Sequence, residues 1–274
     1  MIVVGLDHHD EGESIPEKPE GERGGDRRNL GLHPEEAELV RVVSALNRRT
    51  VVVVQGGGAI TMEEWRNEAP SILLAFYAGQ EGGHAIARIV FGDVNPSGKL
   101  PFTLPADTSW LPPFDPKAET VAYGYYHGYT LAEKKGVEPA FPFGFGLSYT
   151  RFAYSNLHLS AQAVDPGGAV EVSVDVTNKG PRPGEEVVEL YAGFPASKVD
   201  RPVKLLRGFD KVPLSPGESK TVRFTLRASD LAYWDTASGS FQVEEAPYEA
   251  LVGGSSRRDD LLAAPFRVTR EVPR

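Results

Sequence analysis

The sequence contains no cysteine among its 274 residues. This absence excludes disulfide bonds, thiolate nucleophiles and zinc sites built from cysteine. The sequence also lacks any apolar run near the roughly 20 residues that cross a bilayer, and its first residues lack the basic and apolar regions of a signal peptide. We therefore expect a soluble chain, with the cytoplasm as its default location.

Basic residues are fewer than acidic ones, with 29 Lys and Arg against 38 Asp and Glu, for a formal net charge of -9. Nucleic acids and anionic membranes are bound by a basic surface that neutralises phosphates. The charge therefore predicts neither as a partner and favours a neutral or cationic ligand.

The first part of the chain, residues 1–105, alternates β-branched runs with helical patterns, which predicts an α/β sandwich domain with a mostly parallel sheet. Strands are expected at 1–4, 50–54 and 71–77. In the helix that begins near 34, Leu39, Val42, Val43 and Leu46 fall at helical spacing, so this face is predicted to cover the sheet. Because the chain starts inside a strand, we expect an N-terminal truncation of this domain.

The second part, residues 151–274, changes to a period of two, as in the alternating valines of 170–176. Strand patterns separated by turns predict an all-β sandwich of the immunoglobulin or fibronectin type III kind. Between the two parts, residues 106–150 are rich in Pro, Gly and aromatic residues. They predict an irregular linker held by aromatic packing.

Three glycines, Gly56 to Gly58, follow the second strand. They match neither a Walker loop nor a dinucleotide-binding fingerprint, so they predict a tight turn and no nucleotide site. No cofactor is expected.

The acidic stretch "GLDHHDEGES", residues 5–14, directly follows the first strand. His8, His9, Asp10, Glu11 and Glu13 are possible metal ligands, but their spacing matches no recognised pattern, and adjacent histidines on an extended backbone would point to opposite sides. A solvated loop is the second interpretation. The third is a catalytic carboxylate, because open α/β sheets place their ligand sites past the carboxyl ends of strands.

Several long stretches resemble glycoside hydrolase family 3, the family of many β-glucosidases and β-xylosidases. The resemblance to the C-terminal half of these enzymes rests on "GLDHHDEGES…GGDRRNLGL", "TVVVVQGGGAITMEEW", "GQEGGHAIARIVFGDVNPSGKLPFT" and "FPFGFGLSYT". The stretches "EVVELYAGFP", "KLLRGFDKVPLSPGES" and "YEALVGGSS" resemble the fibronectin type III-like domain that closes many members.

The resemblance implies a retaining β-glycosidase whose aspartate nucleophile lies on an N-terminal barrel that these residues do not include. It implies that the α/β domain lends the acid/base glutamate on the loop after "VVVGL". Glu11 is the first choice and Glu13 the second, with Glu20 and Glu22 as weaker candidates. Asp26 and Arg27 are expected to support the loop, as an anchoring ion pair rather than as substrate contacts.

Two functions stay open at this point. The chain is either the part of a β-glycosidase that supplies the acid/base group, inactive without the barrel nucleophile, or a non-catalytic fibronectin III-like interaction or scaffold module. The first predicts a β-glucoside or β-xyloside as the substrate, and as its partner a barrel domain or chain that carries the nucleophile.

Overall fold

The computed structural model describes residues 1–11, 27, 29–113 and 118–270. They form two compact units. The first unit comprises Met1–Val94, Leu104–Leu111 and Glu138–Phe141, and the second comprises Asn95–Thr103, Pro112–Val137 and Pro142–Arg274. The segments between the two predicted folds therefore contribute to both units.

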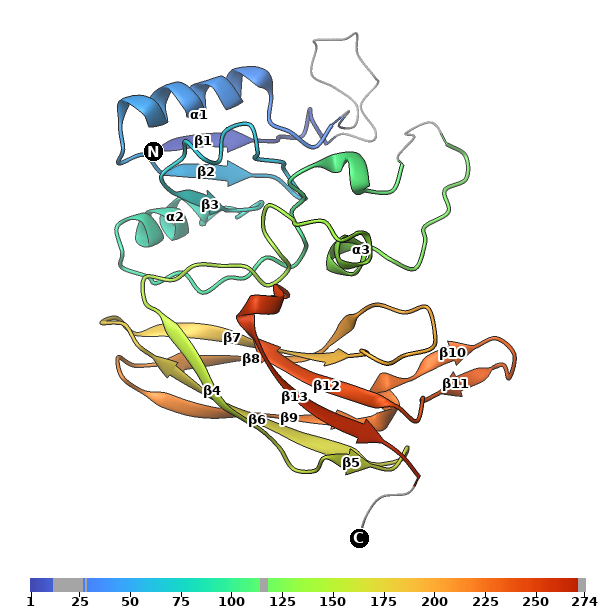
Figure 1. The fold of residues 1–274 in the computed structure, drawn as a ribbon. Coiled ribbons are helices and arrows are strands. Elements are labelled where there is room, and N and C mark those ends of the chain that lie inside the picture. The colour runs from blue at the N-terminus through green and yellow to red at the C-terminus, as the bar shows by residue number, and fades with distance from the viewer. Residues whose placement is uncertain (12–26, 28, 114–117, 271–274) are drawn as a thin grey trace. The chain divides into compact units, whose positions relative to one another are not determined.

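The first unit is built on a parallel sheet of β1 (Ile2–Gly5), β2 (Val52–Gln55) and β3 (Ile72–Leu74), in the order β1-β2-β3. The central strand is a run of fully buried valines, as expected for a strand covered on both faces. All three arrows point to the same edge of the sheet (Figure 1). The prediction of an α/β domain with a parallel sheet is confirmed.

The helix α1 (Pro34–Leu46) lies beside β1 (Figure 1), but it buries a different face from the predicted one. Its buried residues are Ala37, Val40 and Ser44. Leu46, from the predicted face, is 82% exposed. The buried positions also fall at helical spacing, and two of them carry small side chains that allow close packing. The predicted face was therefore wrong, because the spacing of apolar residues does not take into account how closely small side chains can pack.

The third strand is shorter than predicted, since 71–77 was expected and β3 ends at Leu74. Phe76 adopts a positive φ of 53°, which few residues other than glycine tolerate, so the chain leaves the sheet direction there. After this turn, α2 (Gly82–Val90) follows, and the short 3₁₀ helix η1 (Thr108–Trp110) belongs to the same unit.

The second unit is a sandwich of two sheets, which confirms the predicted all-β fold. The three-stranded sheet has the order β4-β6-β9 and the five-stranded sheet the order β5-β13-β12-β7-β8 (Figure 1). Its strands are β4 (Phe152–Leu159), β5 (Ala163–Val164), β6 (Ala169–Asn178), β7 (Gly184–Gly193), β8 (Lys204–Leu214), β9 (Ser219–Arg227), β12 (Pro247–Gly253) and β13 (Leu261–Val268). The hairpin of β10 (Tyr233–Asp235) and β11 (Ser240–Gln242) extends the unit, which also holds the 3₁₀ helices η2 (Ala228–Leu231) and η3 (Arg258–Asp260).

The core of the sandwich comes from the alternation that the sequence displays. Val170, Val172, Val174 and Val176 on β6 are fully buried and pack in one cluster with side chains of both sheets. The register of β6 with β9 is unbroken from Ala169 to Thr177. Inward-facing valines thus fix which face of β6 enters the core.

Aromatic residues of the segments before β4 divide between the units. In the second unit, Tyr129 on α3 (Gly128–Lys135) lies 5.5 Å from Phe143 and 5.9 Å from Tyr191, measured between ring centroids. Phe141 belongs to the first unit, where it forms an isolated bridge with Leu104. The predicted linker therefore includes a regular helix.

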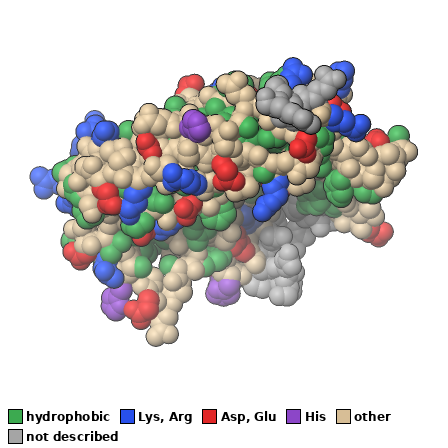
Figure 2. Space-filling view, turned by 90° about the horizontal axis from the view of Figure 1, so that it is seen from below, with side chains coloured by type: hydrophobic (Ala, Val, Ile, Leu, Met, Phe, Trp, Pro, Cys, Tyr) green, Lys and Arg blue, Asp and Glu red, His purple; other side chains and the backbone are tan. Residues whose placement is uncertain are grey.

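Charged side chains of both signs are interspersed on the face shown in Figure 2. Within the described residues, no helix combines the length and the apolar character that crossing a membrane requires.

Candidate active site

Three loops meet at the edge where the parallel strands end. Glu11 follows β1, Gly57 follows β2 and Tyr77 follows β3. A Cβ atom placed on Gly57 would lie 2.9 Å from the Tyr77 ring and 3.2 Å from Glu11 Oε2, which shows how closely the three loops approach. This edge is where open α/β sheets place their ligand sites.

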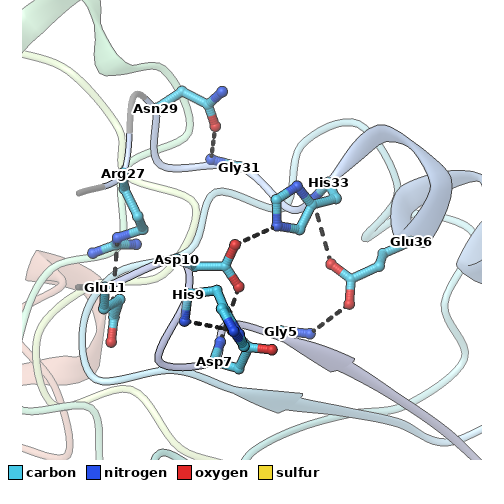
Figure 3. Close-up of polar contacts among 10 residues, drawn as sticks. All are labelled: Gly5, Asp7, His9, Asp10, Glu11, Arg27, Asn29, Gly31, His33 and Glu36. Atoms are coloured by element: carbon cyan, nitrogen blue, oxygen red, sulfur yellow. Dashed lines mark hydrogen bonds and ion pairs between the residues drawn. The ribbon is translucent and has the colours of Figure 1, made fainter. Parts of the chain in front are cut away.

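The Glu11 carboxylate contacts a different partner with each oxygen. Its Oε1 lies 3.4 Å from Nε of Arg27 in an ion pair, which Figure 3 shows with the guanidinium beside the carboxylate. Its Oε2 accepts a hydrogen bond from the hydroxyl of Tyr77. The Glu11 side chain keeps 22% of its surface exposed, so it is held and still reachable.

Arg27 is itself fixed to the loop after β2. Its NH1 group donates a hydrogen bond of 2.8 Å to the carbonyl of Ala59. A Cβ atom on Gly58 would lie 3.2 Å from NH2 of Arg27, so glycine leaves the guanidinium room there. The arginine therefore links the loops after β1 and β2.

Asp10 anchors the turn that presents Glu11. Its buried carboxylate accepts a hydrogen bond of 2.9 Å from the backbone N–H of Asp7 and lies 2.7 Å from Nε2 of His33 (Figure 3). The backbone N–H of Glu11 donates to the carbonyl of Asp7 at 3.2 Å. The residue before Glu11 is thus fixed from two sides.

The first turn of α1 is joined to the end of β1. Oε1 of Glu36 accepts a hydrogen bond of 3.1 Å from the backbone N–H of Gly5. Gly5 has a φ of 136°, and a Cβ atom there would lie 1.9 Å from the carbonyl oxygen of Gln55. Only glycine fits where the loop leaves the strand.

The hydroxyl of Tyr77 has a raised pKa. Its partial desolvation raises the pKa of Tyr77, and the hydrogen bond and negative charge of Glu11 raise it further. The phenol therefore stays protonated as a donor, although 54% of the Tyr77 surface is exposed.

Asp7, His8 and His9 form the one group of described residues whose ligand atoms could share a metal ion, and all three are exposed. His8 and His9 lie in a turn, with ring centroids 3.8 Å apart, so the expectation that they point to opposite sides was wrong. The backbone N–H of His9 is the main cause that lowers the pKa of Asp7. In the described part of the chain, the Asp7 carboxylate therefore accepts its hydrogen bonds from its own loop.

The structure brings together two of the predicted site residues, Glu11 and Arg27. Glu13, Glu20, Glu22 and Asp26 lie outside the described residues. Sequence reasoning missed Tyr77, because this residue was assigned to a strand. It also missed the anchoring role of Asp10. The rule that neighbouring parallel strands end at one edge would have indicated Tyr77, had the end of β3 been recognised.

Residues 1–149 match the model of the glycosyl hydrolase family 3 C-terminal domain. The chain belongs to glycoside hydrolase family 3. Residues 186–256 also match the fibronectin type III-like domain, in agreement with the sandwich of the second unit. Both parts of the resemblance seen in the sequence are therefore confirmed.

Relatives in family 3 are named as β-glucosidases. The chain is 40% identical over 263 residues to thermostable β-glucosidase B of Acetivibrio thermocellus. The aligned region covers 94% of the chain and 34% of that protein.

Solved structures of β-glucosidases have the same fold. The β-D-glucoside glucohydrolase of Trichoderma reesei has a TM-score of 0.85 at 33% identity, over 97% of this chain and 39% of that one. A β-glucosidase of Kluyveromyces marxianus in complex with glucose has a TM-score of 0.84 at 38% identity, over 98% of this chain and 31% of that one. The chain thus spans about a third of the length of the relatives it matches.

Proposed function

We propose that this chain supplies the acid/base glutamate, Glu11, of a retaining β-glycosidase that acts on β-glucosides. The observation that carries the proposal is the position of Glu11, held at the carboxyl edge of the sheet by Arg27 and Tyr77 and still reachable from solvent. The family and the names of the relatives support the substrate class.

In the first step, Glu11 gives its proton to the glycosidic oxygen while the bond between that oxygen and the anomeric carbon breaks. A carboxylate nucleophile forms the new bond to the anomeric carbon, and the leaving group departs as an alcohol. In the second step, the Glu11 carboxylate takes a proton from water, whose oxygen bonds to the anomeric carbon and displaces the nucleophile.

The nucleophile of this scheme lies on a barrel domain outside these 274 residues, as the family resemblance implies. General acid/base catalysis supplies only part of the rate, typically about 10²–10⁴-fold. We therefore expect the 274-residue chain alone, without that nucleophile, to show little or no hydrolysis of aryl β-glucosides.

A chimera tests the proposal. Residues 1–274 are joined to the part of the Acetivibrio thermocellus relative that precedes its matched region, and hydrolysis of an aryl β-glucoside is measured beside the isolated chain. The proposal expects activity in the chimera and none in the chain alone. Normal enzyme rates from the isolated chain, or a well-folded chimera without activity, would contradict it, and the second result would favour a scaffold module.

A further inference from the structure

The two oxygens of the Glu11 carboxylate lie in different surroundings. Oε2 accepts the hydrogen bond of the Tyr77 hydroxyl, whereas Oε1 lies 3.4 Å from Nε of Arg27. A separation of 3.4 Å is longer than an ordinary N–H···O hydrogen bond but within ion-pair range. One oxygen is therefore held by a hydrogen-bond donor and the other by a nearby charge.

The position of Tyr77 is set by the backbone around it. The N–H of Ala75 still bonds to the carbonyl of Val54 at 2.8 Å, in continuation of the sheet. The next residue, Phe76, has a φ of 53°, and Tyr77 follows this turn. Non-glycine residues in this conformation are uncommon and cluster at functional sites. Gly57 then leaves the space in which the phenol and the carboxylate meet.

We propose that Tyr77 is a positioning residue, which holds Oε2 of Glu11 so that Oε1 carries the proton exchanged with the substrate and with water. This inference rests on the proposed function of Glu11. A phenol donates to the unprotonated oxygen of a carboxylic acid as well as to a carboxylate, so the contact persists through both steps. Arg27 stabilises the negative charge that appears when the proton leaves Oε1.

The contact is tested first in the 274-residue chain, without any activity measurement. Tyrosine labelled with carbon-13 at Cζ reports ionisation by nuclear magnetic resonance, and Tyr77→Phe identifies the signal of Tyr77. Because Glu11 raises the pKa of Tyr77, Glu11→Gln should lower that pKa toward its ordinary value. Unchanged ionisation of Tyr77 in the Glu11→Gln chain would overturn the proposed contact.

The role of the contact is tested in the active chimera. Tyr77→Phe should lower kcat about ten-fold for a β-glucoside with a poor leaving group, change KM little, and affect an activated leaving group less. The matched control is Tyr123→Phe, at an exposed tyrosine of the second unit, which should change neither constant.

The outcomes separate this inference from the proposed function. If Glu11→Gln gives the leaving-group dependence of an acid/base residue and Tyr77→Phe does not, Glu11 acts without positioning by Tyr77, and this inference is wrong. If Glu11→Gln gives equal losses for both leaving groups, the proposed function itself fails. If Tyr77→Phe raises KM and leaves kcat unchanged, Tyr77 binds substrate, and the positioning role is likewise excluded.

Discussion

The Nε2 atom of His33 lies 2.7 Å from Oδ1 of Asp10, so the N-cap residue just before α1 is tied to the turn that presents Glu11. The Asp10 side chain is almost fully buried, and its other oxygen accepts the N–H of Asp7. The position of Glu11 thus depends on Asp10, a buried neighbour that is held both by the backbone of Asp7 and by the side chain of His33.

Replacement of Asp10 by alanine should loosen this turn. The change leaves the N–H of Asp7 and the imidazole of His33 without their acceptor, which typically costs about 1–3 kcal/mol. The free energy of unfolding of the first unit, measured with denaturant, should fall by that amount. The matched control is Glu38→Ala, which removes an exposed ion pair with Arg41 and should cost about 0.5 kcal/mol or less. Equal losses in the two variants would contradict the anchoring role.

The glycine loop after β2 gives a second prediction. In Gly57→Ala, the new methyl group would press on the Tyr77 ring and on Glu11 Oε2, at 2.9 and 3.2 Å. Both side chains can move, so the free energy of unfolding should change little while kcat of the chimera falls about ten-fold or more. The control is Gly83→Ala in α2, where a Cβ atom meets nothing within 4 Å and activity should stay unchanged. Full activity of the Gly57→Ala chimera would contradict the prediction that the three loops around Gly57 position the catalytic groups.

The sandwich should have a pH-dependent stability that comes from Glu189 on β7. This side chain is buried, its Oε2 accepts a hydrogen bond of 2.5 Å from the Tyr191 hydroxyl, and burial raises the pKa of Glu189 to about 7. Below the ordinary value of 4.5 both states are protonated. Between 4.5 and 7 only the unfolded state releases the proton, so stability falls as pH rises.

The variant Glu189→Gln should remove this loss. The free energy of unfolding of the second unit at pH above 7 should rise by up to about 3 kcal/mol, and its slope between the two pKa values should flatten. Denaturant unfolding across the pH range measures both. The exposed Glu171→Gln on β6 is the control and should keep the wild-type slope. A Glu189→Gln variant with the same slope as the wild type would show that Glu189 does not titrate in this range.

The sequence predicted which helices and strands form better than it predicted which of their faces are buried and where they end. Alternating valines located β6 in the sandwich because burial on one face demands a period of two. The buried face of α1 was missed, since Ala37 and Ser44 carry weak hydrophobic signals but allow close packing. The left-handed turn at Phe76 carries no local signal, because glycine is the usual residue at such a φ. The predicted domain boundaries at 105 and 150 remain a prediction.

The contacts of the candidate site were predicted only in part, for a related reason. Glu11 was accessible to sequence reasoning because it follows a buried strand and lies in a family pattern. Tyr77 reaches Glu11 only through the register of three strands, and the partner of Asp10 lies 23 positions away at His33. Such contacts depend on how loops close in space, which spacing along the chain does not specify.

The most direct measurement is the leaving-group dependence of Glu11→Gln in the active chimera. If Glu11 is the acid/base residue, kcat/KM should fall about 10²–10⁴-fold for an alkyl β-glucoside and far less for an activated aryl β-glucoside, since a good leaving group needs little protonation. Equal losses on both substrates would contradict the account and transfer the role to Glu13.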